Sequence, residues 1–388
     1  MSQSKKTVPP YGGFEQGPIR PPSEAASLLI RLTRNCPWNR CTFCPVYKGE
    51  RFSLRPVAHV KQDIDALHRH AVRIRAAADA DGRISRKDLD AILAHVAAGD
   101  EAACQAALHW LGGGMTSIFL QDANSLIMRP ADLIEILQYL KDRFAWVTRI
   151  TSYARSHTIA RISDSDLTAM AGAGLNRIHI GLESGSDRVL QRVRKGVDKA
   201  THIRAGLKVR RAGMELSEYV MPGLGGRELS HEHALETADA LNHINPDFIR
   251  LRSLAIPNQV PLFADYAQGR FEKCTDTQMA QEILLFLEML DGITSTLCSD
   301  HILNLFQDVE GKLPDDKPKM TGVIRRFLDM TPQDRVHYQI GRRLGIFNDL
   351  DDMRQPVPMD QVRRICRDNG ITADNVDAVI EEVMKRFI

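Results

Sequence analysis

The sequence contains the stretch Arg34-Asn35-Cys36-Pro37-Trp38-Asn39-Arg40-Cys41-Thr42-Phe43-Cys44, in which three cysteines have the spacing C-x4-C-x2-C. Three thiolates this close repel one another, and a bound cation or metal cluster relieves that repulsion. A disulfide framework is not expected, because the other cysteines are scattered and fit ordinary buried thiols. These are Cys104, Cys274, Cys298 and Cys366.

The spacing alone leaves several kinds of metal site open. Structural zinc takes four ligands, and no further Cys or His lies at a zinc-finger spacing from the three cysteines. A plant-type [2Fe–2S] ferredoxin has the same first three ligands but needs a fourth, and the next cysteine is the distant Cys104. On a [4Fe–4S] cluster, three cysteines leave one iron open to a small molecule.

Short apolar, β-branched runs alternate with amphipathic segments of helix length, which predicts a parallel sheet with helices outside it. Six such units are too few for a complete eight-fold barrel. We therefore expect an α/β fold, a partial (β/α)6 TIM-like barrel, with a helical C-terminal extension. The cysteines follow the first strand, at the edge where such sheets bind ligands. The expected strands are Leu28–Thr33, Ser117–Leu120, Val147–Ser152, Arg177–Gly181, Glu215–Val220 and Phe248–Ser253.

The chain is expected to have three parts. Residues 1–24, rich in Pro, Gly and polar side chains, predict a disordered segment. Residues 25–260 form the barrel core, which carries a helical insertion at 74–112. Residues 265–388 read as a helical cap, which we expect to close the barrel mouth. The insertion imitates part of an EF-hand calcium loop but lacks its first ligand, so we interpret it as a turn between helices.

Composition excludes some classes of function. The 388 residues carry a net charge of only +2, which gives no electrostatic reason to expect nucleic acid or an anionic membrane as a partner. No apolar run is long enough to span a membrane, and no signal peptide is evident at the N-terminus. We therefore expect a cytoplasmic protein that does not bind membranes.

The sequence resembles the radical S-adenosylmethionine (SAM) superfamily over about residues 25–260. Phe43 stands between the last two cysteines, as the aromatic residue of that family's cysteine motif does. The segments His179–Gly185 and Leu190–Gly196 are similar to the elongator-catalytic-subunit-like and oxygen-independent coproporphyrinogen oxidase-like branches. Two features depart from the family pattern. Four residues, not three, separate the first two cysteines, and Gln121–Asn124 stands where relatives have a Gly-Gly-Glu-like segment.

The resemblance implies a radical SAM enzyme, an oxidoreductase or transferase. It implies a [4Fe–4S] cluster on Cys36, Cys41 and Cys44 that cleaves SAM reductively to a 5′-deoxyadenosyl radical. It also implies a reductant, such as flavodoxin or ferredoxin, and a small-molecule substrate that the sequence does not identify. The alternative function is a non-catalytic iron–sulfur electron carrier or sensor. The candidate residues for SAM binding are Phe43, Asp122, Asn124, Tyr153, Arg155, Glu183, Ser184, Arg194, Met221 and Gly223.

One segment outside the core also suggests chemistry. In Ser299–Gln307, polar residues recur at helical spacing within an apolar stretch. Asp300 and His301 stand side by side there and are our candidate catalytic residues, for substrate binding or for proton transfer after the radical step. The alternative interpretation is a helix that begins at Ser299 or Asp300 and carries a surface histidine.

Overall fold

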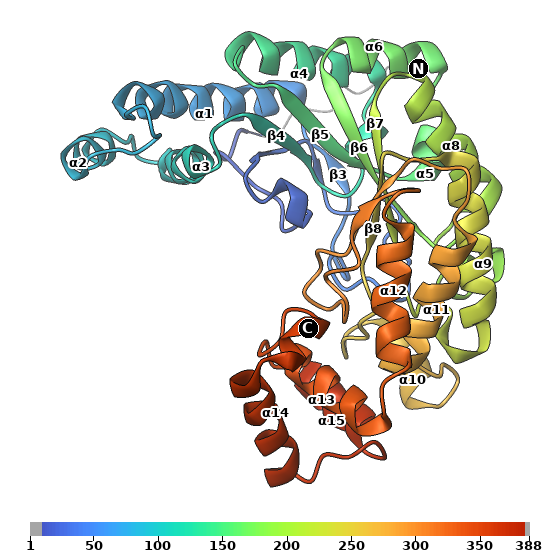
Figure 1. Cartoon of the computed structure of the whole chain (residues 1–388). Helices are drawn as coiled ribbons and strands as arrows, with labels where there is room; N and C mark the ends of the chain where they lie inside the picture. The colour runs from blue at the N-terminus through green and yellow to red at the C-terminus, as the bar shows by residue number, and fades with distance from the viewer. Residues whose placement is uncertain (1–9, 385–388) are drawn as a thin grey trace. The chain divides into compact units, whose positions relative to one another are not determined.

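The computed structural model describes residues 10–384. It is a mixed α/β fold whose main sheet has eight strands in the order β1-β4-β5-β6-β7-β8-β9-β10, with a separate β2–β3 pair (Figure 1). The strands are β1 Leu28–Arg31, β2 Thr33–Arg34, β3 Ser53–Leu54, β4 Ser117–Gln121, β5 Arg149–Ala154, β6 Leu175–Glu183, β7 Glu215–Val220, β8 Phe248–Leu251, β9 Thr296–Cys298 and β10 Gly311–Lys312. The predicted fold class is confirmed.

The chain divides into two compact units, which are described separately. The first comprises the chain up to Pro37, Gly49–His179 and Arg211–Glu215. Its helices are α1 Val57–Ala77, α2 Arg86–Ala94, α3 Glu101–Gly112, α4 Pro130–Arg143, α5 Ser156–Ile159 and α6 Asp164–Gly172, with short 3-10 turns at Pro22–Glu24 and Ser125–Ile127.

Parallel pairing organises the sheet of the first unit. β1 pairs in parallel with β4, and β4 with β5, so their carboxyl ends meet at one edge. Helix α4 begins with Pro130 at its first position, where a missing N–H costs nothing. It buries Leu133, Ile136, Leu137 and Leu140, one apolar stripe at helical spacing.

The insertion at 74–112 is helical, as expected, and its EF-hand-like stretch is a turn. One carboxylate oxygen of Asp79 accepts the N–H groups of Asp81 and Arg83, at 3.0 and 2.8 Å. A single β-bridge between Ala78 and Ile84 closes the turn before α2 begins. The Asp79 carboxylate thus stabilises the local backbone.

The N-terminal segment differs from the disorder predicted for 1–24. Residues 1–9 lie outside the described residues, but from residue 10 on the segment makes specific contacts. The hydroxyl of Tyr11 donates to Asp63 at 2.7 Å, and Glu15 forms ion pairs with Arg34 and Arg55, each at 2.9 Å. Composition did not reveal this order because it comes from charged partners distant in the sequence.

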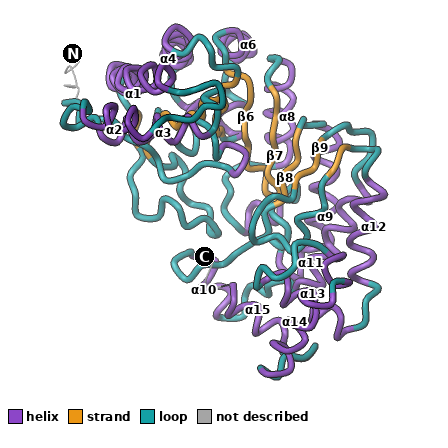
Figure 2. The backbone as a smooth tube through the Cα atoms, turned by 60° about the vertical axis from the view of Figure 1, so that its left-hand side comes forward, coloured by secondary structure: helices purple, strands orange, loops and turns teal. Residues whose placement is uncertain are grey.

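The second unit comprises Trp38–Lys48, Ile180–Arg210 and the chain from Leu216 onward. Its helix α11 packs against both α9 and α12, as Figure 1 shows, and Figure 2 gives a second view of these helices. The helices of this unit are α7 Asp187–Arg192, α8 Lys199–Arg211, α9 Gly226–Ile244, α10 Pro261–Ala267, α11 Asp276–Met289, α12 Lys317–Leu328, α13 Pro332–Arg343, α14 Pro356–Asp368 and α15 Val376–Met384, with a 3-10 turn at Leu350–Arg354.

The region predicted as a purely helical cap also contains two strands. β9 continues the sheet in parallel beside β8, and β10 pairs antiparallel with β9. Strands of three and two residues are too short to show an alternating pattern, so sequence periodicity missed them. Among the described helices, none is long and apolar enough to cross a membrane.

Candidate functional site

The cysteine loop Trp38–Lys48 is closed by polar contacts within itself. The ammonium group of Lys48 donates to the carbonyl oxygens of Asn39 and Cys41, at 3.1 and 2.8 Å. The Asn39 side chain donates to the carbonyl of Tyr47, and Asn39 has a left-handed backbone, with φ of 47°. These contacts give the loop a defined shape around Cys41.

The same loop is anchored by main-chain groups of the turn that follows α7. The Thr42 N–H donates to the Val193 carbonyl at 2.9 Å, and the Trp38 indole N–H donates to the Arg194 carbonyl at 2.8 Å. The Thr42 carbonyl in turn accepts the Leu262 N–H at 3.0 Å. Arg194, a predicted SAM contact, thus uses its backbone here, and the residue is exposed.

The segment between the last two cysteines enters an apolar cluster. Phe43, which is 9% exposed, packs with Met221 and Leu224, and Cys41 and Cys44 pack against the same cluster. An apolar shell around sulfur ligands limits water access and tunes the properties of a metal site. Phe43 and Met221, both predicted SAM contacts, therefore belong to one wall beside two of the cysteines.

Glu183 ends β6 in an ion pair. Its carboxylate lies 3.0 Å from the Lys195 ammonium, and the two side chains are 13% and 12% exposed. Glu183 has a φ of 64°, a conformation that a residue other than glycine rarely adopts. A Cβ on Gly181 would lie 2.2 Å from the Glu183 carboxylate, so a side chain there would displace the ion pair. The N-cap of α7 is Ser186, which leaves Glu183 with no capping role.

Ser184 and Gly223 are both held by helices behind the sheet. The Ser184 hydroxyl lies 2.8 Å from Nδ1 of His233 on α9 and accepts the Ser186 N–H at 3.0 Å. The Gly223 N–H donates to Glu282 of α11 at 2.7 Å. Sequence reasoning missed His233 and Glu282, because each is far in sequence from the residue it contacts.

In the first unit, Asp122 follows β4 and is fully buried. Its Oδ2 accepts two N–H groups of Arg31, at 2.7 and 3.0 Å, and the Asn35 N–H at 2.9 Å. Its Oδ1 has no hydrogen-bond partner within residues 10–384. A Cβ on Gly17 would lie 1.8 Å from Oδ1, so the N-terminal segment covers that oxygen closely.

The other candidates of the first unit join the ends of β4 and β5. The side-chain oxygen of Asn124 accepts the backbone N–H of Arg155 at 3.0 Å, and its side-chain NH2 group donates to the Thr158 hydroxyl at 2.9 Å. The Tyr153 ring packs edge-on against Phe119, with ring centroids 5.1 Å apart. Asn124 therefore already uses both ends of its side chain to hold the β5 end.

Asp300 and His301 lie in a turn after β9, not in the helix that their spacing suggested. Arg250 donates to the Asp300 carboxylate at 2.9 Å. Burial, with the charge of Arg252, lowers the pKa of His301 to about 4 despite the opposing effect of Asp300. The imidazole is therefore neutral at pH 7, and its surroundings disfavour the protonated form.

Sequence reasoning also missed Glu218 on β7. It is fully buried, and neither carboxylate oxygen has a hydrogen-bond partner within the described part of the chain. Burial holds its pKa well above the usual range, although Lys195 opposes the shift and Glu183 adds to it. The only available signal was an acidic residue in the middle of a strand, at Glu215–Val220.

Three of the four scattered cysteines are buried, whereas Cys298, also expected to be a buried thiol, is partly exposed. Cys104, Cys274 and Cys366 are at most 3% exposed, and burial raises the pKa of each thiol, to about 12 for Cys274. Protonated, buried thiols are poor metal ligands. Within residues 10–384, no group of three or more His, Cys, Asp or Glu side chains that could hold one metal ion is found.

Residues 30–238 match the model of the radical SAM superfamily, which is more than half of the chain. The chain belongs to the radical SAM superfamily. This radical SAM protein has no match among the curated proteins. Membership implies that the protein is an enzyme with radical SAM chemistry. Proteins of this family normally bind a [4Fe–4S] cluster and SAM.

Solved structures also resemble this radical SAM protein. One is the archaeal Elp3 of Methanocaldococcus infernus, with 13% identity and a TM-score of 0.41 over 52% of this chain and 53% of that one. Another is coproporphyrinogen III oxidase (HemN) of Escherichia coli, with 17% identity and a TM-score of 0.44 over 68% of this chain and 52% of that one. The chain thus covers about half the length of each.

Proposed function

We propose that the protein holds a [4Fe–4S] cluster on Cys36, Cys41 and Cys44 and uses it to cleave SAM reductively. The observation that carries the proposal is the C-x4-C-x2-C motif, which directly follows the first strands within the segment matching the radical SAM family. Together, cluster and SAM would supply a 5′-deoxyadenosyl radical that abstracts hydrogen from a substrate. The substrate is expected to be a small molecule, and the reductant a flavodoxin or ferredoxin.

The donor set fits such a cluster. Three thiols provide three soft ligands and leave one iron open. Each cysteine of a cluster binds a different iron, so the ligands need not converge on one point as those of a single ion do. The loop around Cys41 is preformed by Lys48 and by the main chain of Val193 and Arg194, and preorganised ligands bind with less loss of conformational entropy.

The carboxylates of Asp122 and Glu183 each support SAM binding. Oδ1 of Asp122 lacks a partner within residues 10–384, and the SAM ammonium group is a donor that such an oxygen would accept. The ammonium group would displace the Gly17 segment that covers this oxygen. In the second unit, the Glu183–Lys195 pair is partly accessible at the end of β6 and offers a carboxylate to the hydroxyl groups of SAM.

The proposed catalytic roles remain with Asp300 and His301. Burial lowers the pKa of His301 to about 4, so its uncharged imidazole would bind the substrate through hydrogen bonds and would be a weak proton acceptor. Asp300 is held by Arg250 and therefore has a defined position beside His301. Both residues would act on the substrate after hydrogen abstraction and not on SAM itself.

The decisive experiment is anaerobic reconstitution with iron and sulfide, followed by reduction with dithionite in the presence of SAM. We expect about four irons and four sulfides per chain and slow formation of 5′-deoxyadenosine and methionine without substrate. A protein with a full cluster that neither binds nor cleaves SAM would instead be an electron carrier or sensor. Tight zinc without iron would contradict both functions.

A further inference from the structure

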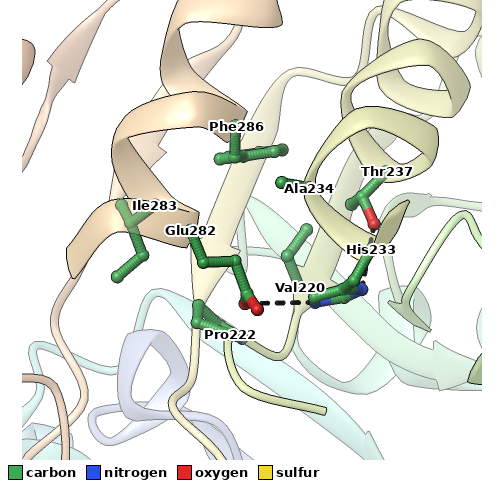
Figure 3. Close-up of a pocket in the computed structure, with 8 residues that line it drawn as sticks. All are labelled: Val220, Pro222, His233, Ala234, Thr237, Glu282, Ile283 and Phe286. Atoms are coloured by element: carbon green, nitrogen blue, oxygen red, sulfur yellow. Dashed lines mark hydrogen bonds and ion pairs between the residues drawn. The ribbon is translucent and has the colours of Figure 1, made fainter. Parts of the chain in front are cut away.

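Two buried side chains from different helices, Glu282 and His233, point toward one another beside Pro222 of the loop Met221–Gly226 (Figure 3). Glu282 of α11 accepts the Gly223 N–H at 2.7 Å, and Nε2 of His233 on α9 lies 3.1 Å from the Met221 carbonyl. Both side chains are only 2% exposed. Glu282 therefore binds a backbone N–H of the loop, and His233 binds a backbone carbonyl two residues earlier in the loop.

The hydrogen-bond network assigns the tautomer of His233. Its Nε2 faces two acceptors, the Met221 carbonyl and the Glu282 carboxylate 3.6 Å away, so Nε2 carries the hydrogen. Nδ1 is then the acceptor for the Ser184 hydroxyl at 2.8 Å. His233 thus links the end of β6 to the loop after β7.

The carboxylate of Glu282 has a second donor, because the Ser230 hydroxyl lies 2.5 Å from its other oxygen. A buried carboxylate with two such donors is well compensated for the loss of water. The cavity beside this network has a volume of only about 10 Å³, room for one water at most. This cavity is therefore too small to bind a ligand. We expect Glu282 and His233 to influence ligand binding through the loop that they hold.

The loop itself needs this support. Gly223 and Gly226 have φ angles of 83° and 62°. These angles lie in the left-handed region, which neither an extended strand nor a right-handed helix uses and which glycine adopts readily. A Cβ on Gly226 would lie 2.7 Å from the Glu272 carbonyl, so the backbones approach closely at this point. A glycine-rich loop is intrinsically flexible, and outside contacts are what select one conformation for it.

We propose that Glu282 and His233 are positioning residues that hold the Met221–Gly226 loop in the conformation that receives SAM. The inference rests on the proposed function, since it assigns a role in SAM binding. Glu282 lies outside residues 30–238, so part of the machinery that prepares the site comes from beyond the segment that matches the family.

The test uses the full chain, reconstituted anaerobically, with the variants Glu282→Met and Glu282→Gln. We expect Glu282→Met to raise the Kd for SAM about tenfold, the size of one lost charged hydrogen bond. Its iron content, and its kcat for uncoupled 5′-deoxyadenosine formation, should stay within about twofold of wild type. Glu282→Gln keeps an oxygen that can accept the Gly223 N–H and should restore most of the affinity.

The matched control is Asp276→Asn, on the same helix. Asp276 is buried and pairs with Arg343 at 2.6 Å, so this variant should lower Tm without changing the Kd for SAM. Wild-type affinity in Glu282→Met would overturn the inference and leave the proposed function intact, whereas failure of wild type to bind SAM would remove both. If Glu282→Met does not fold, Ser230→Ala should raise the Kd about threefold, and an unchanged Kd there counts equally against the inference.

Discussion

The indole N–H of Trp38 donates to the carbonyl of Arg194, and a Cβ on Gly196 would lie 2.3 Å from the same indole ring. The ring therefore occupies the space that a side chain at position 196 would need. This contact joins the cysteine loop to the turn after α7, where Gly196 has a φ of 73°.

Replacing Gly196 by Ala should destabilise the protein and weaken its hold on iron. The positive φ costs about 1 kcal/mol, and displacement of Trp38 adds about 1–2 kcal/mol in the free energy of unfolding. Gly345→Ala is the control, because Gly345 has a φ of 71° but nothing within 4 Å of the added Cβ. Denaturant titration and iron-release kinetics measure both effects. Equal behaviour of the two variants would contradict the proposed role of the Trp38 contact.

Glu218→Gln should change how stability depends on pH. Since burial raises the pKa of Glu218, the folded state keeps its proton where the unfolded chain loses it. The associated stability is present below the ordinary glutamate pKa and is lost as pH rises toward the raised value, by up to about 1.4 kcal/mol per pH unit. The variant should remove this slope, and denaturant titrations between pH 5 and 8 would show it. The exposed Glu310→Gln should keep the wild-type slope.

Alanine at Cys36, Cys41 or Cys44 should abolish the cluster, because each supplies one of its three thiolates. Alanine at Cys104, Cys274, Cys298 or Cys366 should leave the iron content unchanged. Iron and sulfide analysis after anaerobic reconstitution distinguishes the two groups. Loss of the whole cluster in Cys104→Ala alone would point to a ferredoxin with four cysteine ligands.

Glu183→Ala should weaken SAM binding and leave the cluster intact. It removes the carboxylate that pairs with Lys195 at the end of β6, and we expect a rise of about tenfold in the Kd for SAM. The measurement is the change that SAM causes in the electron paramagnetic resonance spectrum of the reduced cluster. Glu232→Gln, at an exposed pair with Arg188, should bind SAM like wild type.

His301→Ala and Asp300→Ala should separate SAM cleavage from substrate turnover. Both variants should load the cluster and form 5′-deoxyadenosine without substrate at the wild-type rate, but lose turnover of the native substrate. Because the pKa of His301 is about 4, no activity change between pH 6 and 8 should depend on its titration. Full turnover by either variant would remove its catalytic role.

Much of the fold could be predicted because periodicity reports which faces are buried. The strand Glu215–Val220 has the predicted bounds, since it combines a clear pattern with turn residues at its ends. The short strands β9 and β10 could not be predicted, because their pairing partners and not their own residues make them strands. The ordered residues 10–24 depend likewise on distant charges.

Only part of the candidate site could be predicted from the sequence. Motif positions such as Glu183 could be selected because strand ends carry ligands in this fold class. Their partners could not, because the contacts join residues far apart in the chain: His233 is 49 residues from Ser184, and Glu282 is 59 residues from Gly223. The motif His179–Gly185 predicts a SAM contact for Ser184, but the hydrogen bond between its hydroxyl and His233 could not be predicted from that motif.

Two hydrogen bonds that anchor the cysteine loop join main-chain groups alone, from the Thr42 N–H to the Val193 carbonyl and from the Leu262 N–H to the Thr42 carbonyl. Every residue type except proline offers these groups, so evolution could replace all three side chains and keep the anchor. Substituting side chains would therefore not reveal this anchor, whereas measuring the hydrogen–deuterium exchange of the backbone amides would. The Thr42 and Leu262 amides should exchange slowly and together, which would mark the loop as one cooperative unit with its surroundings.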